Sequence, residues 1–169
     1  MVKRVAVFFL VAWVAFFAFM PKEEFYFSLE KVLAKEGIEI NESRISEGLF
    51  TLSLHELTVY AKGIKMATMQ DAKCFTLLLY TDLTINGVVV DKMLKSMFPT
   101  KVEKLQLTHS VFSPLQVRIE GEGSFGTATG MVDLAERKIH IDFGKSAKLE
   151  AFRSRLKHGK EGWYYESTY

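Results

Sequence analysis

The sequence predicts a mainly β protein with a few short helices, in which one N-terminal transmembrane helix precedes a curved, mostly antiparallel sheet or partial barrel. Three observations predict this fold class. Residues 5–20 carry no charge and no strongly polar group. Apolar and polar residues then alternate in many short segments, as they do in strands with one buried face. Glycines lie inside several of these segments, where they usually mark bends of a curved sheet.

The apolar run of residues 5–20 is expected to anchor the chain in a membrane. Lys3 and Arg4 precede it, and Lys22 follows it. As a helix the run covers roughly 24 Å, slightly less than a hydrocarbon core, and the long basic side chains at its ends can reach the interfaces. A cleaved signal peptide has an apolar region of similar length, but phenylalanines occupy the positions where cleavage requires small residues. The sequence therefore favours an uncleaved anchor within residues 1–21.

The distribution of charge around the anchor predicts its orientation. Basic flanks stay in the cytoplasm, so we expect residues 22–169 on the outer side, in the periplasm of a bacterium, with the anchor in its inner membrane. The predicted partner is therefore the lipid bilayer. Nucleic acid is not expected as a partner because of this location, whereas the net charge of +2 argues neither for nor against a polyanionic partner.

Helix signals occur at three places after the anchor. The predicted helices are short and lie near residues 28–36, 91–98 and 147–157. Ser28 is the expected N-cap of the first, and Gly37 lies just past its end. Asp91 can cap the second, which Pro99 stops.

Strand patterns fill most of the remaining chain, and seven or eight strands are expected. Alternation over residues 50–54 slips by one position before Leu57, which predicts a bulge near His55–Glu56. Residues 73–90 form a long apolar stretch. Turn or kink points are expected in it at Thr81–Asp82 and Asn86–Gly87.

The clearest hairpin lies near the end of the chain. Apolar residues and glycines share one face over residues 117–125, and the chain continues through residues 126–134. A turn at 135–137 then returns it along residues 139–143. Residues 162–169 are expected to form a last strand.

No catalytic site is expected, and neither is a metal or a cofactor. The four histidines show no metal-ligand spacing, and the single cysteine, Cys74, excludes an intramolecular disulfide or a zinc site with two thiolates. The glycines of residues 121–126 resemble a dinucleotide-binding motif, but they lie inside a hairpin with no helix following them. We therefore expect a protein that is not an enzyme.

Apolar strand residues and a basic stretch near the end of the chain are candidate contacts with a partner or a lipid. The basic stretch has two interpretations: attraction to anionic headgroups or an acidic partner, and a solvated face near a helix C-terminus. The candidate contact residues are Phe75, Leu77, Leu79, Ile139, Ile141, Phe143, Lys148, Arg153, Arg155 and Lys157.

The order of features resembles a known group of envelope proteins. A short anchor precedes FSLEKVLAKEGIEINESRISEGLFTLSLHELTVYAKGIKM, and MATMQDAKCFTLLLYTDLTINGVVVDKML and GEGSFGTATGMVDLAERKIHIDF follow. These segments are similar to patterns in the N-type proteins of the type II secretion system and in AsmA-like envelope proteins. The resemblance implies an elongated, curved sheet with an apolar inner face, tied to envelope transport or assembly. The group has no shared catalytic motif, and this chain is shorter than its typical members.

Two functions are compatible with these observations. The first is a non-catalytic, membrane-anchored periplasmic component of a secretion or envelope-assembly system, which acts through protein contacts of its sheet. The second is a lipid-binding or lipid-transfer module that holds an acyl chain in an apolar groove. They differ in whether the concave face of the sheet is open or is filled by its own side chains.

Overall fold

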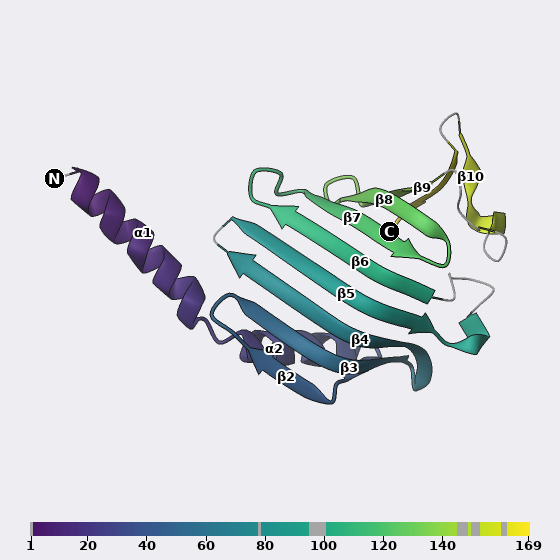
Figure 1. The fold of residues 1–169 in the computed structure, drawn as a ribbon, viewed down its shortest axis with the longest axis horizontal. Helices are drawn as coiled ribbons and strands as arrows, with labels where there is room; N and C mark the ends of the chain where they lie inside the picture. Colours follow the sequence, from purple (N-terminus) through teal and green to yellow (C-terminus); the bar gives the residue numbers. More distant parts are fainter. Residues whose placement is uncertain (1, 78, 95–100, 145–148, 150–152, 160–161) are drawn as a thin grey trace.

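Two α-helices and one large open sheet make up the protein (Figure 1). The computed structural model describes residues 2–77, 79–94, 101–144, 149, 153–159 and 162–169. The helices are α1 (Val2–Phe19) and α2 (Lys22–Lys35), and two short 3-10 helices are η1 (Lys92–Leu94) and η2 (Arg153–Arg155). The strands are β1 (Ile38–Asn41), β2 (Arg44–Glu47), β3 (Thr51–Ala61), β4 (Ile64–Leu77), β5 (Tyr80–Val90), β6 (Lys101–Ser110), β7 (Gln116–Gly123), β8 (Gly126–Asp133), β9 (Lys138–Phe143), β10 (Lys157–His158) and β11 (Trp163–Thr168).

The sheet is antiparallel throughout, and its strands follow one another from β3 to β9 in chain order. At one end β1 and β2 both pair with β3, and at the other β11 pairs with β9 and carries β10. The predicted mainly β class and the open antiparallel sheet are therefore confirmed. The described residues form eleven strands rather than seven or eight, and two of the eleven, β2 and β10, are short segments without a clear apolar alternation.

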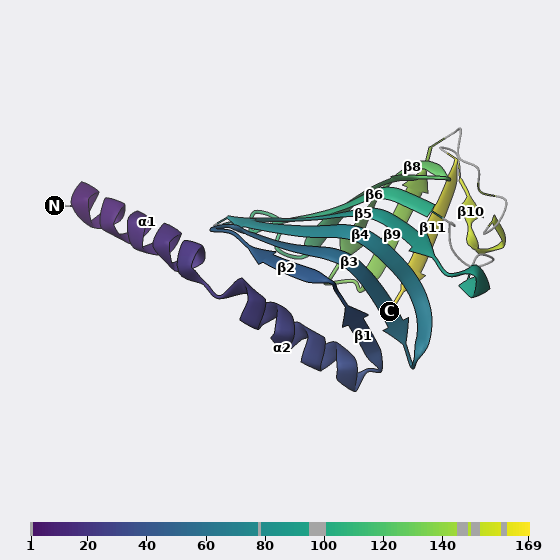
Figure 2. The same cartoon turned by 60° about the horizontal axis from the view of Figure 1, so that its bottom comes forward.

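The pairing register gives the sheet one apolar and one polar face. Residues directly opposite each other on neighbouring antiparallel strands point to the same side. One such row crosses the sheet from β3 to β11 and is almost entirely apolar: Leu52, Cys74, Leu83, Leu107, Ile119, Gly130, Ile141 and Tyr165. The next row is polar: Ser53, Lys73, Thr84, Gln106, Glu120, Thr129, Asp142 and Tyr164. The apolar face is concave, and α2 lies along it beneath β3 and β4 (Figure 2).

The alternation of side chains between the two faces of the sheet shifts by one residue in three of the long strands, and these three shifts lie on one line across the sheet. We call this line the crease; it consists of Glu56 in β3, Gln70 in β4 and Gly87 in β5, which lie next to the paired residues His55, Asp71 and Asn86. Leu54 and Leu57, three positions apart on either side of the crease, line the same groove. Glu56 and Gly87 have positive φ angles of 51° and 64°, so the backbone itself carries the change of phase.

The crease accounts for the predicted bulge near His55–Glu56. The shift in pairing between β3 and β4 lies farther along, between Val59 and Tyr60. Gly87 is a kink within β5, as one of the two alternatives for Asn86–Gly87 predicted. The turn or kink expected at Thr81–Asp82 is wrong, because both residues lie in the regular pairing of β5 with β4, and the chain reverses between Leu77 and Tyr80. An uninterrupted run of leucines hides that turn in the sequence.

The hairpin predicted near the end of the chain is confirmed. It consists of β7, β8 and β9, with the turn between Asp133 and Lys138. At this end the concave face has a core of Phe125, Ala128 and Leu149, which are 4%, 7% and 5% exposed. Partly buried neighbours pack around this core: Val102, Ile141, Phe143, Leu156 and Trp163.

The helices differ from their predicted positions. The helix expected near 28–36 begins at Lys22, because Ser28 does not cap it: the Ser28 hydroxyl donates to the Glu24 carbonyl one turn earlier, at 2.8 Å. Its end before Gly37 agrees with the prediction, and Gly37 has a φ of 75°.

Of the other two predicted helices, only short pieces are described. In the helix near 91–98, the Asp91 carboxylate accepts a hydrogen bond from the Met93 amide at 3.0 Å, and η1 is a single 3-10 turn. Residues 95–98 lie outside the described residues. In the helix near 147–157, η2 is described, and Lys157 belongs to β10 rather than to a helix.

The helix α1 contains residues 5–19 of the predicted anchor, whose apolar run was expected to extend to Met20. Within the described residues, no helix meets the length and apolarity needed to cross a membrane.

Candidate ligand groove

An apolar groove of about 580 Å³ lies between α2 and the concave face of β1, β3, β4 and β5. This volume is within the range of pockets that hold small organic ligands. The lining residues come from the end of α1 through β5: Met20, Lys22, Phe25, Tyr26, Leu29, Ile40, Leu52, Leu54, Leu57, Val59, Met69, Ala72, Cys74, Thr76, Leu83 and Ile85.

The groove is not filled by the side chains of the protein. Phe25 and Leu29, on the face of α2 that lines it, are 59% and 54% exposed. Only Tyr26, Leu57, Ala72 and Lys22 among its lining residues are buried. No large side chain in the described part of the chain is fully buried. The groove therefore offers apolar surface that a ligand would remove from water.

The first of two contacts that hold α2 at the groove joins Lys22 and Glu47. Glu47 Oε1 accepts hydrogen bonds from the Lys22 amide at 3.2 Å and from Lys22 Nζ at 3.5 Å. Glu47 thereby caps the N-terminus of α2, since Pro21 at the N-cap position has no side chain that can accept a hydrogen bond. The hydrogen bond from the Lys22 amide lowers the pKa of Glu47, and the Glu23 amide adds to the effect.

The second contact joins Tyr26 and Glu42. Tyr26 Oη donates to Glu42 Oε2 at 2.8 Å, and Tyr26 is 8% exposed. Burial raises the pKa of Tyr26, and the bond to the Glu42 carboxylate raises it further. Tyr26 and Lys22 lie one helical turn apart, so the two contacts hold one side of α2 against the chain around β1 and β2.

A polar hollow of about 520 Å³ lies at the crease on the side away from the groove. Its lining residues are Ser43, Arg44, His55, Glu56, Gln70 and Asp71. His55 Nδ1 contacts Asp71 Oδ1 because the register places the two residues opposite each other. Ser43 Oγ donates to the His55 carbonyl at 3.1 Å, so its hydroxyl is directed to the backbone and not to the imidazole. The hollow does not have the arrangement of a serine nucleophile and its base.

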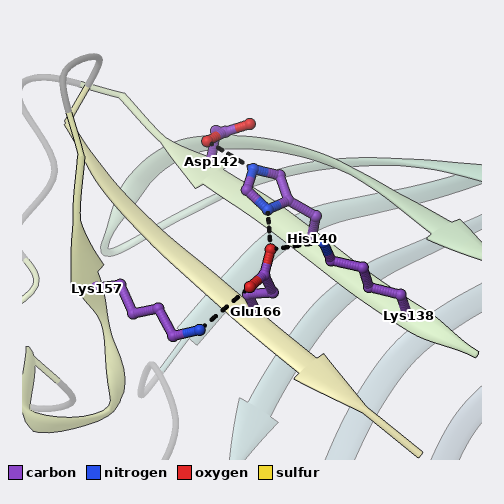
Figure 3. A network of polar contacts seen from close by, with 5 residues as sticks. All are labelled: Lys138, His140, Asp142, Lys157 and Glu166. Atoms are coloured by element: carbon purple, nitrogen blue, oxygen red, sulfur yellow. Dashed lines mark hydrogen bonds and ion pairs between the residues drawn. The ribbon is translucent and has the colours of Figure 1, made fainter.

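A second polar network joins β9, β10 and β11 (Figure 3). Glu166 is at its centre: it contacts Lys138 Nζ at 2.9 Å, Lys157 Nζ at 3.1 Å and His140 Nδ1 at 3.4 Å. His140 Nε2 contacts Asp142 at 3.1 Å. The bond from Lys138, and next that from Lys157, lowers the pKa of Glu166 to about 2. The network ties three strands together, and no group of three ligating side chains in the described residues is arranged to hold a metal ion.

The apolar candidate residues fall on both faces of the sheet. Ile139, Ile141 and Phe143 share the concave face, at the end opposite the groove, where Ile141 and Phe143 pack on the Phe125 core. Phe75 lies opposite Asp82 and, like Leu77, alternates with groove-lining residues, so both belong to the other face. Leu79 lies between β4 and β5 and is 41% exposed. The structure therefore does not bring these six residues into one groove.

The basic candidate residues belong to the C-terminal end of the sheet. The Arg153 guanidinium lies over the Trp163 ring, 4.5 Å from its centroid, and Lys157 pairs with Glu166. Arg155 is exposed in η2, and Lys148 lies outside the described residues. Two of these cations thus have partners within the protein.

Most groove residues were not singled out from the sequence. The alternation of Leu52 and Leu54 and the apolar stripe of α2 were visible signals of buried faces. The contact between Lys22 and Glu47 had no signal, since it joins residues 25 positions apart.

Comparison of the chain with protein-family models, curated proteins and solved structures finds no match. The resemblance to secretion and AsmA-like envelope proteins therefore stays a prediction.

Proposed function

We propose that the protein is a membrane-anchored lipid-binding module that holds an acyl chain in the groove beneath α2. The observation that carries this proposal is the groove itself, which is apolar, unfilled and begins at Met20, directly after α1. Each methylene group that enters it would contribute about 0.8 kcal/mol of hydrophobic stabilisation. Of the two functions compatible with the sequence, this is the one that an open concave face favours.

The surface of α1 supports the membrane part of the proposal. Val7 to Val11 are consecutive residues, so they point in all directions around the helix, and they are 57% to 69% exposed. In Figure 1 the helix extends away from the sheet, which leaves its apolar surface without a protein core. In this proposal α1 anchors the chain in a bacterial inner membrane, with Lys3 and Arg4 on the cytoplasmic side and the sheet in the periplasm. Because the helix by itself does not meet the length and apolarity needed to cross a membrane, the proposal requires the long side chains of Lys3 and Arg4 to reach the cytoplasmic interface.

The position of the groove relative to α1 supplies a route for the ligand. With α1 in the bilayer, the end of the groove at Met20 and Lys22 lies at the membrane surface. An acyl chain then passes from the bilayer into the groove with little exposure to water. The protein contributes binding and position in this process, and the proposal includes no chemical step.

A second candidate function, contact with other envelope proteins, is favoured by the edge of β11. β10 pairs only with Trp163 and Tyr164, so Tyr165–Thr168 have no strand on that side among the described residues. An extended segment of a partner can add to such an edge. Photocrosslinking in cells from residue 167 tests this candidate: a discrete protein adduct supports it, and the absence of any adduct contradicts it.

Alkylation of Cys74, the only cysteine, tests the lipid groove directly. The full chain is held in a bile-salt detergent, which has no acyl chain, and a phosphoglyceride is added. Because Cys74 lines the groove, we expect lipid to slow its reaction with a maleimide several-fold. A matched control carries Cys74→Ala with Lys73→Cys, which moves the thiol to the polar face. The proposal fails if lipid leaves Cys74 as reactive as before, or slows both thiols equally.

A further inference from the structure

Lys22 is a charged residue in the lining of an otherwise apolar groove. It is 7% exposed, and it lies where the groove begins, one position after Pro21 and two after the Met20 carbonyl that it contacts. Burial of a lysine costs free energy unless its charge is compensated. When a ligand is bound at the groove entrance, the charge of Lys22 must therefore be compensated by an acceptor on the protein or on the ligand.

The contacts of Lys22 leave it capacity for another acceptor. An ammonium group has three N–H donors. Lys22 Nζ lies 3.1 Å from the Met20 carbonyl oxygen and 3.5 Å from Glu47 Oε1, and the second contact is long for a hydrogen bond. Glu47 is held independently by the Lys22 amide at 3.2 Å. The ammonium can therefore turn to a ligand oxygen while Glu47 stays on the helix N-terminus.

At this entrance the Lys22 ammonium already has a carboxylate partner, since the Glu47 side chain contacts it and is 33% exposed. A headgroup with negative charge alone would compete with Glu47 for this one ammonium. A headgroup that carries both a phosphate and an ammonium would find a partner for each charge.

We propose that the groove selects phosphoglycerides whose headgroup carries a primary amine beside the phosphate, as in phosphatidylethanolamine. The phosphate oxygen accepts a hydrogen bond from Lys22 Nζ, and the amine donates to the Glu47 carboxylate, of which Oε1 alone is engaged by Lys22. The acyl chain lies between α2 and β3–β5. This inference rests on the proposed lipid-binding function and adds the choice of headgroup to it.

Native mass spectrometry of the full chain tests the selection. The protein is released from vesicles that contain equal amounts of phosphatidylethanolamine and phosphatidylglycerol, and the lipid adducts are identified by mass. We expect phosphatidylethanolamine adducts to exceed phosphatidylglycerol adducts several-fold. Ala72→Phe, which fills the groove at a 6% exposed position, is expected to remove this excess and leaves any lipid on α1 in place.

Three variants assign the selection to the entrance. Lys22→Met is expected to reduce the phosphatidylethanolamine adducts about tenfold, equivalent to ~1.4 kcal/mol, and Lys22→Arg is expected to retain them. Lys31→Met removes an exposed cation of the same helix and is the matched control. Glu47→Gln is expected to raise the share of phosphatidylglycerol, because it removes one carboxylate from the entrance.

Three outcomes overturn the inference in different ways. Equal or greater amounts of phosphatidylglycerol on the unaltered protein, with Ala72→Phe reducing both lipids alike, contradict the headgroup selection and leave the lipid groove standing. Adducts that Ala72→Phe does not reduce contradict the groove itself. A Lys22→Met protein that keeps the preference contradicts the role of Lys22.

Discussion

The two ends of the concave face share one apolar pattern but are completed differently. At the β7–β11 end, Phe125, Ala128 and Leu149 fill the face with the protein's own side chains. At the β3–β5 end, α2 covers the face and leaves about 580 Å³ between them. Continuous rows of apolar residues run through both ends, so the strands alone do not decide the outcome. What differs is the element placed over them.

Under the proposed function, the filled end stabilises the fold and the hollow end binds the ligand. A filled core gains free energy from packing, whereas a hollow groove gives up part of that free energy until a ligand enters. The crease lies in the hollow half, where it directs both Leu54 and Leu57 to the groove. Four predictions follow from this comparison, and they are ordered from the largest expected effect to the smallest.

Phe125→Ala is expected to give the largest loss of stability. Phe125 is 4% exposed and packs edge-on against Phe143 with ring centroids 5.9 Å apart. Truncation of a core phenylalanine typically lowers the free energy of unfolding by about 3–5 kcal/mol. Urea denaturation of the full chain, monitored by circular dichroism, measures this loss of free energy of unfolding.

The matched variant at the hollow end is Leu83→Ala, which removes a groove-lining side chain that is only partly buried. Its loss should be clearly smaller than that of Phe125→Ala. Equal losses would show that the groove is packed as tightly as the core and would break the comparison.

Tyr26→Phe is expected to loosen α2 by removing the hydrogen bond to Glu42. A hydrogen bond to a charged group contributes about 1.5–3 kcal/mol. Faster alkylation of Cys74 behind the helix reports the loosening.

In the unaltered protein α2 is expected to loosen in the same way at high pH. Since the pKa of Tyr26 in the folded protein is raised, the stabilisation from its hydrogen bond is complete below the ordinary value of about 10 and is lost as the pH rises beyond it. A Cys74 rate that Tyr26→Phe leaves unchanged would speak against this contact as a support of α2.

Gly87→Ala tests the crease. A φ of 64° costs an alanine about 1–2 kcal/mol, and the added Cβ would lie 2.5 Å from Cδ of the Gln70 side chain. Gly63→Ala is the control, because its φ is 76° and its Cβ would meet no atom within 4 Å. We expect a lower melting temperature for Gly87→Ala than for Gly63→Ala. Adding Gln70→Ala to Gly87→Ala should remove the difference, and no recovery would exclude the Gln70 contact as its cause.

Glu166→Gln is expected to have the smallest effect, since its contacts with Lys138 and Lys157 are near the surface. The folded pKa of about 2 lies below the ordinary glutamate value, so the stabilisation is present above about pH 4.3 and is lost as the pH falls toward 2. Glu120→Gln is the control, because Glu120 in β7 lies on the same face of the sheet as Glu166. After correction for the intrinsic pH dependence of exchange, the hydrogen-exchange rate of the β11 amides should rise at acid pH in the unaltered protein. A corrected rate that does not depend on pH in this range would contradict the role of the network.

The sequence predicted the parts of the fold that depend on local patterns. Alternation along residues 117–143 gave three strands and their turn, and the apolar faces of β3 and β9 followed from the same rule. The turn between Leu77 and Tyr80 was missed, because leucines continue through it without a turn residue. Local patterns fail where apolar composition is uniform.

The site depended on contacts that no local pattern reveals. Ser28 had the residue type and position of an N-cap, yet Glu47 in β2 serves the start of α2. Phe75 and Leu77 were chosen for their apolar character, but the register placed them on the polar face. The volume of the groove is set by how far α2 stands from the sheet, and long-range contacts fix that distance.

Mapping of a photoreactive acyl chain tests the central claim most directly. The full chain is placed in vesicles that contain a phosphoglyceride with a diazirine near the middle of one chain, irradiated, digested and analysed by peptide mass spectrometry. Beyond adducts on α1, we predict adducts on α2 and on the groove-lining residues of β3, β4 and β5, and their loss in Ala72→Phe. Adducts confined to α1, or on β7–β9 in preference to β3–β5, would contradict the account.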